Sequence, residues 1–180
     1  MRLLYHLAVT PDTGIIARDV CGGGGLKLYF LRHGQANWEN WTKADDERPL
    51  TKKGLKEITA IANALRKLEV HPNVILTSPL PRAWETANVV SQALNIEYET
   101  SPLLAPGFDL NALRQLLNEH NDRDILFVGH EPDFSAIIAA LTGGNVRMAK
   151  AGIARVDLAD GANLTGQLIW LIPPKVLKEI

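Results

Sequence analysis

Arg32 and His33 are the first residues whose types and position suggest chemistry. They follow the apolar segment 28–31, which has the length and composition of a buried strand, and Gly34 comes next, where the backbone can turn sharply. Ligands of an open α/β sheet bind beyond the carboxyl ends of its strands, so we expect both side chains in such a crevice. A histidine there can serve as a nucleophile, a base or a metal ligand, and the planar guanidinium of an arginine suits a phosphate or carboxylate.

Two further junctions between a strand and a helix carry residues of the same kind. Arg82 comes soon after the apolar segment 74–77, in the first turn of an expected helix, and His130 follows the apolar segment 125–128. The carboxyl ends of parallel strands share one edge of a sheet, so two arginines and two histidines can converge there. The N-termini of two helices add partial positive charge. The sequence therefore predicts a site for a dianion such as a phosphoryl group.

The chemistry that suits such a site is phosphoryl transfer through a histidine. One histidine can attack phosphorus in line while its neighbours stabilise charge on the equatorial oxygens of the transition state. Nearby positive charge lowers the pKa of the attacking histidine and keeps a ring nitrogen unprotonated. Water then attacks phosphorus and regenerates the enzyme. We expect no metal ion or other cofactor, because the arginines and histidines supply the positive charge.

The strands that must position these residues alternate with helices along the chain. The expected strands are 28–31, 74–77, 124–129, 152–158 and 167–172. This βαβ alternation predicts an α/β fold with a mostly parallel central sheet and helices on both faces, to which the last hairpin adds an antiparallel edge.

The helices are expected where residues that favour an N-terminus precede apolar residues spaced three or four apart. These starting residues are Thr51, Ser78, Asp109 and Pro132. Pro79 would occupy the first helical position after Ser78. In the helix after Thr51, the buried face is expected to run from Leu55 to Leu68.

Composition limits the class of protein. The chain of 180 residues suffices for one domain with a substantial core, and 46% hydrophobic and 22% charged residues are ordinary for a globular protein. The formal net charge of −1 gives no electrostatic reason to expect nucleic acid or an anionic membrane as a partner. Cys21 is the only cysteine, so no intramolecular disulfide can form. No apolar run approaches the ~20 residues of a membrane span. We therefore expect a cytoplasmic protein.

Residues 1–26 differ from the rest of the chain. They end in the glycine run 22–25, which precedes a strand, whereas a phosphate-binding glycine loop follows a strand and opens a helix. We expect 1–26 to be a flexible N-terminal extension with a glycine linker. Residues 27–180 then form the domain that carries the candidate site.

Three motifs, in this order, resemble those of the histidine phosphatase superfamily, the phosphoglycerate-mutase-like proteins. They are the segments 32–34 (RHG), 78–87 (SPLPRAWETA) and 129–132 (GHEP). With the segment 48–51 (RPLT) soon after the first motif, the short chain is most similar to the small bacterial phosphohistidine phosphatase branch, over essentially everything after the glycine run.

The resemblance implies a role for each candidate residue. His33 would be the phosphorylated nucleophile, and Arg32, Arg82 and His130 would complete the catalytic phosphate-binding pocket. It also implies a three-layer α/β/α sandwich and makes 27–180 a histidine phosphatase domain.

The chain departs from the mutases and sugar-phosphate phosphatases of this superfamily. Those relatives carry a longer insertion with an acidic proton donor where segment 103–109 is short and has Asp109 as its only acid. Mutases also place an asparagine where this chain has Glu39. Loss of a strong general acid suits phosphohistidine, whose P–N bond breaks without protonating an alkoxide. Glu131 is the first candidate for a proton donor, ahead of Asp109, although it can equally stabilise a helix N-terminus.

Several other residues have interpretations of their own. Trp38 and Trp41 are expected to line the mouth of the site, and Trp84 and Trp170 to pack inside the domain. The acidic segment 45–47 most simply forms a solvated turn that would repel very acidic substrates.

The sequence thus predicts a metal-independent phosphohistidine phosphatase with a covalent phosphohistidine enzyme intermediate. Its partner would be a phosphohistidine-bearing protein of signal transduction, either a phosphotransfer domain or a phosphocarrier, and phosphate or its analogues would bind in the site. Two alternatives stay open. A small-molecule phosphomonoesterase of the same superfamily would depend strongly on leaving-group pKa, and a non-catalytic phosphoprotein-binding module would bind vanadate without turnover.

Overall fold

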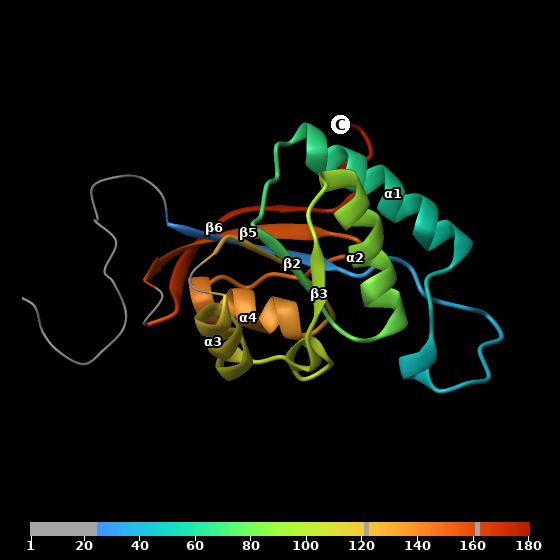
Figure 1. The fold of residues 1–180 in the computed structure, drawn as a ribbon, viewed down its shortest axis with the longest axis horizontal. Coiled ribbons are helices and arrows are strands. Elements are labelled where there is room, and N and C mark those ends of the chain that lie inside the picture. The colour runs from blue at the N-terminus through green and yellow to red at the C-terminus, as the bar shows by residue number, and fades with distance from the viewer. Residues whose placement is uncertain (1–24, 121–122, 161–162) are drawn as a thin grey trace, which may run out of the picture.

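A computed structural model of the chain describes residues 25–120, 123–160 and 163–180, which form a six-stranded sheet between two layers of helices (Figure 1). The strands are β1 (Leu26–Arg32), β2 (Val74–Thr77), β3 (Tyr98–Thr100), β4 (Ile125–Gly129), β5 (Ile153–Asp160) and β6 (Thr165–Ile172). The helices are α1 (Lys52–Lys67), α2 (Pro81–Leu94), α3 (Leu110–Glu119), α4 (Asp133–Thr142) and α5 (Pro174–Leu177), with 3-10 turns η1 (Asp45–Glu47) and η2 (Pro102–Leu104).

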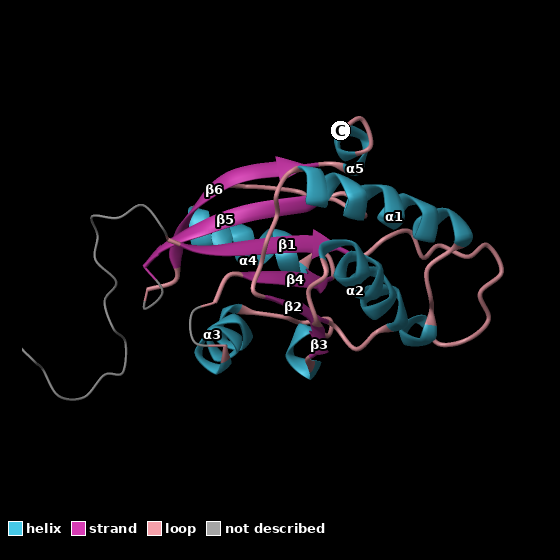
Figure 2. Ribbon diagram, turned by 45° about the horizontal axis from the view of Figure 1, so that its top comes forward, coloured by secondary structure: helices cyan, strands magenta, loops and turns pink. Residues whose placement is uncertain are grey.

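The sheet has the strand order β3-β2-β4-β1-β5-β6. The first four strands of this order are parallel, whereas β5 is antiparallel to β1 and β6 is antiparallel to β5. Figure 2 shows β1, β4 and β2 ending on the same side of the molecule. The predicted α/β/α fold with a mostly parallel sheet is confirmed, and so is the antiparallel hairpin at its edge.

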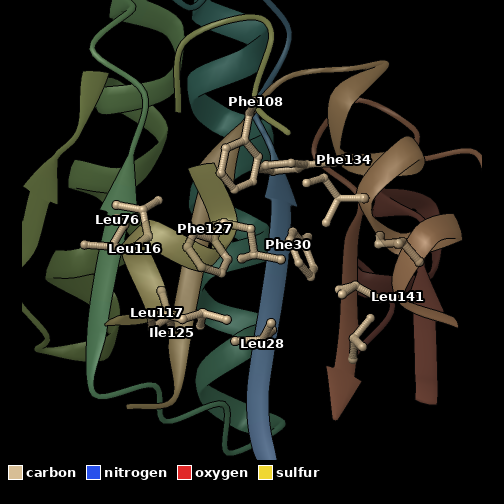
Figure 3. Packing of buried hydrophobic residues seen from close by; sticks show 14 of the residues in the cluster. Leu28, Phe30, Leu76, Phe108, Leu116, Leu117, Ile125, Phe127, Phe134 and Leu141 are labelled. Atoms are coloured by element: carbon tan, nitrogen blue, oxygen red, sulfur yellow. The ribbon is translucent and has the colours of Figure 1, made fainter. Parts of the chain in front are cut away.

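Each face of the sheet is covered by its own helices and its own hydrophobic cluster. Helices α3 and α4 lie on one face, and α1, α2 and α5 lie on the other (Figure 2). Successive strand residues point to opposite faces, so Phe30 packs into the first cluster and Leu31 into the second. In the first cluster Phe30 stacks on Phe127 at 5.4 Å between ring centroids and meets the edge of Phe134 at 5.3 Å (Figure 3).

Helix α1 begins as the sequence predicts but buries a different stripe. The Thr51 hydroxyl oxygen accepts a hydrogen bond of 2.9 Å from the backbone N–H of Gly54, which caps the helix. Leu55 and Leu68, expected in the core, are 47% and 39% exposed. Leu55 is rotated by about 100° from the buried Gly54, and Leu68 lies beyond the last helical residue. The buried stripe consists of Gly54, Ile58, Ile61, Ala62, Ala64 and Leu65.

One other expectation about the elements was wrong, and one strand was not expected. Ser78 does not cap α2, because the helix begins at Pro81 after Leu80, and Pro81 rather than Pro79 takes the first helical position. Strand β3 was not predicted. It has 3 residues with a half-buried or exposed pattern at the sheet edge, too few to show an alternation.

Residues 1–24 of the expected N-terminal extension, 1–26, lie outside the described residues. Leu26 already belongs to the sheet, where it is paired with Leu158 of β5. No helix within the described ranges is long and apolar enough to cross a membrane.

Gly54 supplies a test of how closely α1 packs against the chain just beyond His33. A methyl group at Gly54 would overlap the carbonyl oxygen of Gln35. Alanine favours a helix over glycine by about 1 kcal/mol. We nevertheless expect Gly54→Ala to lower the free energy of unfolding by about 1–3 kcal/mol, because backbone must move to relieve the overlap.

Urea denaturation measures this change. Lys53→Ala, at an exposed neighbour in the same helix, is the control and should change the free energy of unfolding by less than about 0.5 kcal/mol. A Gly54→Ala protein as stable as the parent would show that the contact with Gln35 is not tight.

Candidate active site

The register of three neighbouring strands brings the candidate residues to one edge of the sheet. Arg32 of β1 is paired with Gly129 of β4, and Thr77 of β2 is paired with Val128 of β4. The next residues of β1 and β4 are His33 and His130, whose ring centroids lie 5.2 Å apart. Arg82 follows β2 in the first turn of α2. The predicted convergence of two arginines and two histidines is thus present, while their catalytic roles stay predictions.

His33 is held by backbone hydrogen bonds on both sides. Its N–H donates to the carbonyl of Gly129 at 3.1 Å, and its carbonyl accepts from the N–H of Ala151 at 3.1 Å. The ring is only 8% exposed, and Nδ1 lies 2.8 Å from the carbonyl oxygen of Gly34. A carbonyl oxygen can only accept, so Nδ1 carries the proton and Nε2 keeps its lone pair. The ring is therefore in the tautomer that a nucleophile at Nε2 requires.

Gly34 is needed for space and not for a turn. The sequence suggested a sharp turn there, but among the described glycines only Gly107 and Gly143 have a positive φ. A Cβ on Gly34 would lie 2.6 Å from Cγ1 of Ile58. The N–H of Gly34 also donates to the Thr86 hydroxyl at 3.2 Å. Helices α1 and α2 both press against this residue, which keeps the His33 loop close to the sheet.

Ser78 orients His130. The His130 ring is 4% exposed, and its Nε2 lies 2.8 Å from Oγ of the fully buried Ser78. The same hydroxyl oxygen accepts a bond of 3.3 Å from the N–H of Leu80. Sequence reasoning assigned Ser78 only a capping role. Its position directly after a buried strand, as for His33 and His130, was the signal that could have identified it.

The arginine side chains are anchored at one end and keep donors available at the other. Nη1 of Arg32 donates to the carbonyl of Met148 at 2.8 Å, and Nη1 of Arg82 donates to the carbonyl of Asp45 at 2.8 Å. Within the described part of the chain, the buried Nε atoms of Arg32, Arg48 and Arg82 have no hydrogen-bond partner. Arg48 was not predicted as a site residue. Guanidinium N–H groups suit the oxygens of a phosphoryl group.

Burial and charge keep both histidines neutral. Burial lowers the pKa of His33 to about 3, with smaller contributions from His130, Arg82 and Arg32, against the opposing hydrogen bond to Gly34. Burial also lowers the pKa of His130 to about 4, helped by Arg82 and Arg32 and opposed by Asp45. A neutral imidazole has the unprotonated nitrogen that attack on phosphorus requires.

The two candidate proton donors occupy different environments. Asp109 caps α3, since its Oδ1 accepts a bond of 2.9 Å from the N–H of Ala112. Oε2 of Glu131 accepts from the Ser135 hydroxyl at 2.7 Å, and its Oε1 is buried without a partner in the described ranges. The charge of Glu131 opposes the lowering of the Arg32 pKa by burial. Glu131 therefore lies beside the predicted pocket, and Asp109 serves a helix terminus.

Trp38 and Trp41 lie beside a hollow next to the site. They line a cavity of about 460 Å³ with other residues of the same loop and of the start of α1, and none of the four predicted pocket residues lines it. Trp170 packs as expected, 6.0 Å from the ring of Tyr29. Trp84, also expected to pack, is 39% exposed because it lies on the outer side of α2. Across residues 25–120, 123–160 and 163–180, no three histidine, cysteine, aspartate or glutamate side chains are grouped so that they could hold a metal ion.

The chain is similar in sequence to known proteins. The family model described as Histidine phosphatase superfamily (branch 1) matches residues 28–105. The phosphohistidine phosphatase SixA of Escherichia coli K12 is 30% identical over 160 residues, which cover 85% of this chain and 97% of that protein. An uncharacterised protein of Picosynechococcus is 35% identical over 165 residues, covering 84% of this chain and 99% of that protein.

Solved structures give the same result. The protein histidine phosphatase SixA complexed with tungstate has a TM-score of 0.74 and 30% identity, and the match covers 84% of this chain and 99% of that chain. A mycobacterial glucosyl-3-phosphoglycerate phosphatase, 18% identical, shares the fold at a TM-score of 0.64, over 83% of this chain and 99% of that chain. Because a phosphohistidine phosphatase is 30% identical over nearly the whole of its own length, and its structure superposes on this fold, the chain belongs to the histidine phosphatase superfamily, in the small bacterial branch.

Proposed function

We propose that this protein is a metal-independent phosphohistidine phosphatase that takes phosphoryl groups from histidine residues of a partner protein. The observation that carries the proposal is the state of His33, a buried neutral ring whose Nδ1 is bound to Gly34 and whose Nε2 is free to attack. Similarity to the Escherichia coli phosphohistidine phosphatase over nearly the whole of both chains supports it. Tungstate, which the related structure binds, is a tetrahedral oxyanion like phosphate.

The proposed reaction has two steps at one phosphorus atom. Nε2 of His33 attacks phosphorus in line, and the P–N bond of the substrate breaks with its electron pair going to the departing imidazole. Arg32, Arg82 and His130 stabilise the equatorial oxygens during the transfer. Water then attacks the same phosphorus atom and releases a proton to solvent, the P–Nε2 bond breaks with its electron pair returning to Nε2, and inorganic phosphate leaves. The released electron pair returns His33 to its starting state.

The surroundings of the pocket favour phosphohistidine over an ester. An alkoxide leaving group needs a proton in the transition state, whereas an imidazole nitrogen leaves more readily. Of the two candidate proton donors, Glu131 is engaged by Ser135 and Asp109 caps α3. The loop residues 37–40 beside the site are exposed, which leaves room for the surface of a protein substrate.

We expect wild-type protein to discharge a phosphohistidine-labelled carrier protein quickly in the presence of a chelator, and to cleave an aryl phosphate ester slowly. His33→Ala should lose discharge by at least about 10³-fold, because the nucleophile is removed. Loss of label from the carrier over time measures both rates. His71→Ala, at an exposed histidine away from the site, should retain wild-type activity.

Other outcomes of this assay select the alternatives. Fast ester cleavage without loss of label would make the protein a small-molecule phosphomonoesterase. Vanadate binding with no turnover of either substrate would make it a phosphoprotein-binding module.

The neutral state of the two histidines predicts an unusual titration. The pKa is lowered to about 3 for His33 and to about 4 for His130, so both rings bind a proton only at a pH well below 6.5, the ordinary pKa of histidine. We therefore expect their imidazole NMR signals, assigned with the His33→Ala and His130→Ala proteins, to stay constant between about pH 5 and pH 8. Titration of either ring with a midpoint near 6.5 would contradict the neutral pocket.

The same shift has a consequence for stability. Between the lowered and ordinary pKa values the unfolded chain binds protons that the folded chain does not, so stability falls as pH decreases through this window.

Glu131→Gln tests whether a general acid takes part. If Glu131 protonates an ester leaving group, its loss should lower ester cleavage by about 10²-fold or more, while discharge of phosphohistidine changes by less than about threefold. Initial rates on the two substrates measure this split. Asp133→Asn, at the neighbouring acid, whose carboxylate accepts from the N–H of Gly107, is the control. An equal loss of rate on both substrates would show instead that Glu131 acts by positioning Arg32.

A further inference from the structure

Asp45 bridges two arginines at the edge of the pocket. Its Oδ1 lies 2.7 Å from an Nη2 of Arg48, its Oδ2 lies 3.4 Å from Nη2 of Arg82, and its carbonyl oxygen accepts a bond of 2.8 Å from Nη1 of Arg82. The Arg82 side chain is 7% exposed and the Asp45 side chain 68% exposed. A solvent-exposed carboxylate thus contacts a buried guanidinium that is predicted to hold phosphate.

This arrangement differs from the solvated acidic turn that the sequence predicts for 45–47. The segment does form the exposed turn η1. Only Asp45 of its three acids has an ion pair to an arginine within the described ranges. Asp46 acts on Arg82 more weakly, through the electrostatic field. The turn therefore presents one carboxylate to the pocket, and the other two acids face solvent.

The pocket has more positive charge than its four predicted residues supply. The pKa of Lys150 is lowered by burial and by the nearby charges of Arg32 and Arg48, and Arg48 likewise acts to lower the pKa of Arg82. Arg48 and Lys150 therefore lie close enough to the pocket arginines to repel them. A dianion would relieve this repulsion more fully than one carboxylate does.

We propose that Asp45 is an internal counter-ion that the phosphoryl group of the substrate displaces, so that Arg48 joins Arg82 in binding phosphate. The proposal rests on the proposed function only in requiring that the pocket bind a phosphoryl group. An exposed carboxylate gives up an ion pair at little cost, because water solvates it again. Two freed guanidinium groups can then donate to several oxygens of one tetrahedral anion.

The proposal predicts opposite effects for the two partners of the ion pair. Asp45→Asn removes the competing charge but keeps the backbone carbonyl that Arg82 contacts, so tungstate should bind about two- to fivefold more tightly. Arg48→Gln removes a phosphate donor, so tungstate should bind about tenfold more weakly or worse. Asp46→Asn removes the same charge from the same turn without breaking an ion pair, so it should tighten tungstate binding clearly less than Asp45→Asn does.

Isothermal titration of tungstate into the four full-length proteins tests these values, with near-UV circular dichroism to compare their folds. An unchanged or higher Kd for Asp45→Asn would overturn the inference, and so would an unchanged Kd for Arg48→Gln. Equal tightening by Asp46→Asn would overturn it too, because net charge alone would then explain the gain.

This binding experiment is separate from the assay of phosphohistidine discharge. Tungstate binding needs no turnover, so the expected Kd values together with failed discharge would retain the counter-ion and reject the proposed substrate. Normal discharge with an unchanged Kd for Asp45→Asn would retain the proposed substrate and reject the role of Asp45 as a counter-ion.

Discussion

The parallel pairing of β2, β4 and β1 is the constraint on which the rest of the site depends. Each strand is followed directly by a polar residue, Ser78 after β2, His130 after β4 and His33 after β1, and the register places these residues at one edge of the sheet. A slip of one residue would turn the apolar side chains of a strand to the opposite face. The two hydrophobic clusters therefore fix the register, and the register fixes the distance between His33 and His130.

The site holds like charges together by combining burial with neutral groups. Two arginines lie beside two histidines. Burial lowers the pKa of each imidazole ring, so the rings stay neutral and add no positive charge that the arginines would repel. Backbone carbonyls of Met148 and Asp45 satisfy one end of each guanidinium. The buried Nε atoms of both arginines have no partner within the described ranges, and guanidinium N–H groups of this kind suit the oxygens of a phosphoryl group.

Local signals in the sequence predict the elements well, and contacts between distant segments account for what they miss. Strand β2 has the predicted bounds, and the side-chain oxygens of Thr51 and Asp109 cap helices as expected. Asp45 contacts Arg82, which is distant in the sequence, and Arg48 contacts Asp45, both from a loop without periodicity. No local pattern could have assigned those two residues to the pocket.

The segment that completes the support of His33 comes late in the chain. Arg32 donates its backbone N–H to the carbonyl of Gly152 at 3.0 Å, Ala151 donates to the carbonyl of His33, and Met148 anchors the Arg32 side chain. During synthesis from the N-terminus, residues 32 and 33 emerge first and the segment 148–152 emerges after every other part of the pocket. A nascent chain that has emerged only as far as His130 thus contains all four predicted pocket residues, but the segment that holds Arg32 and His33 in place is still missing.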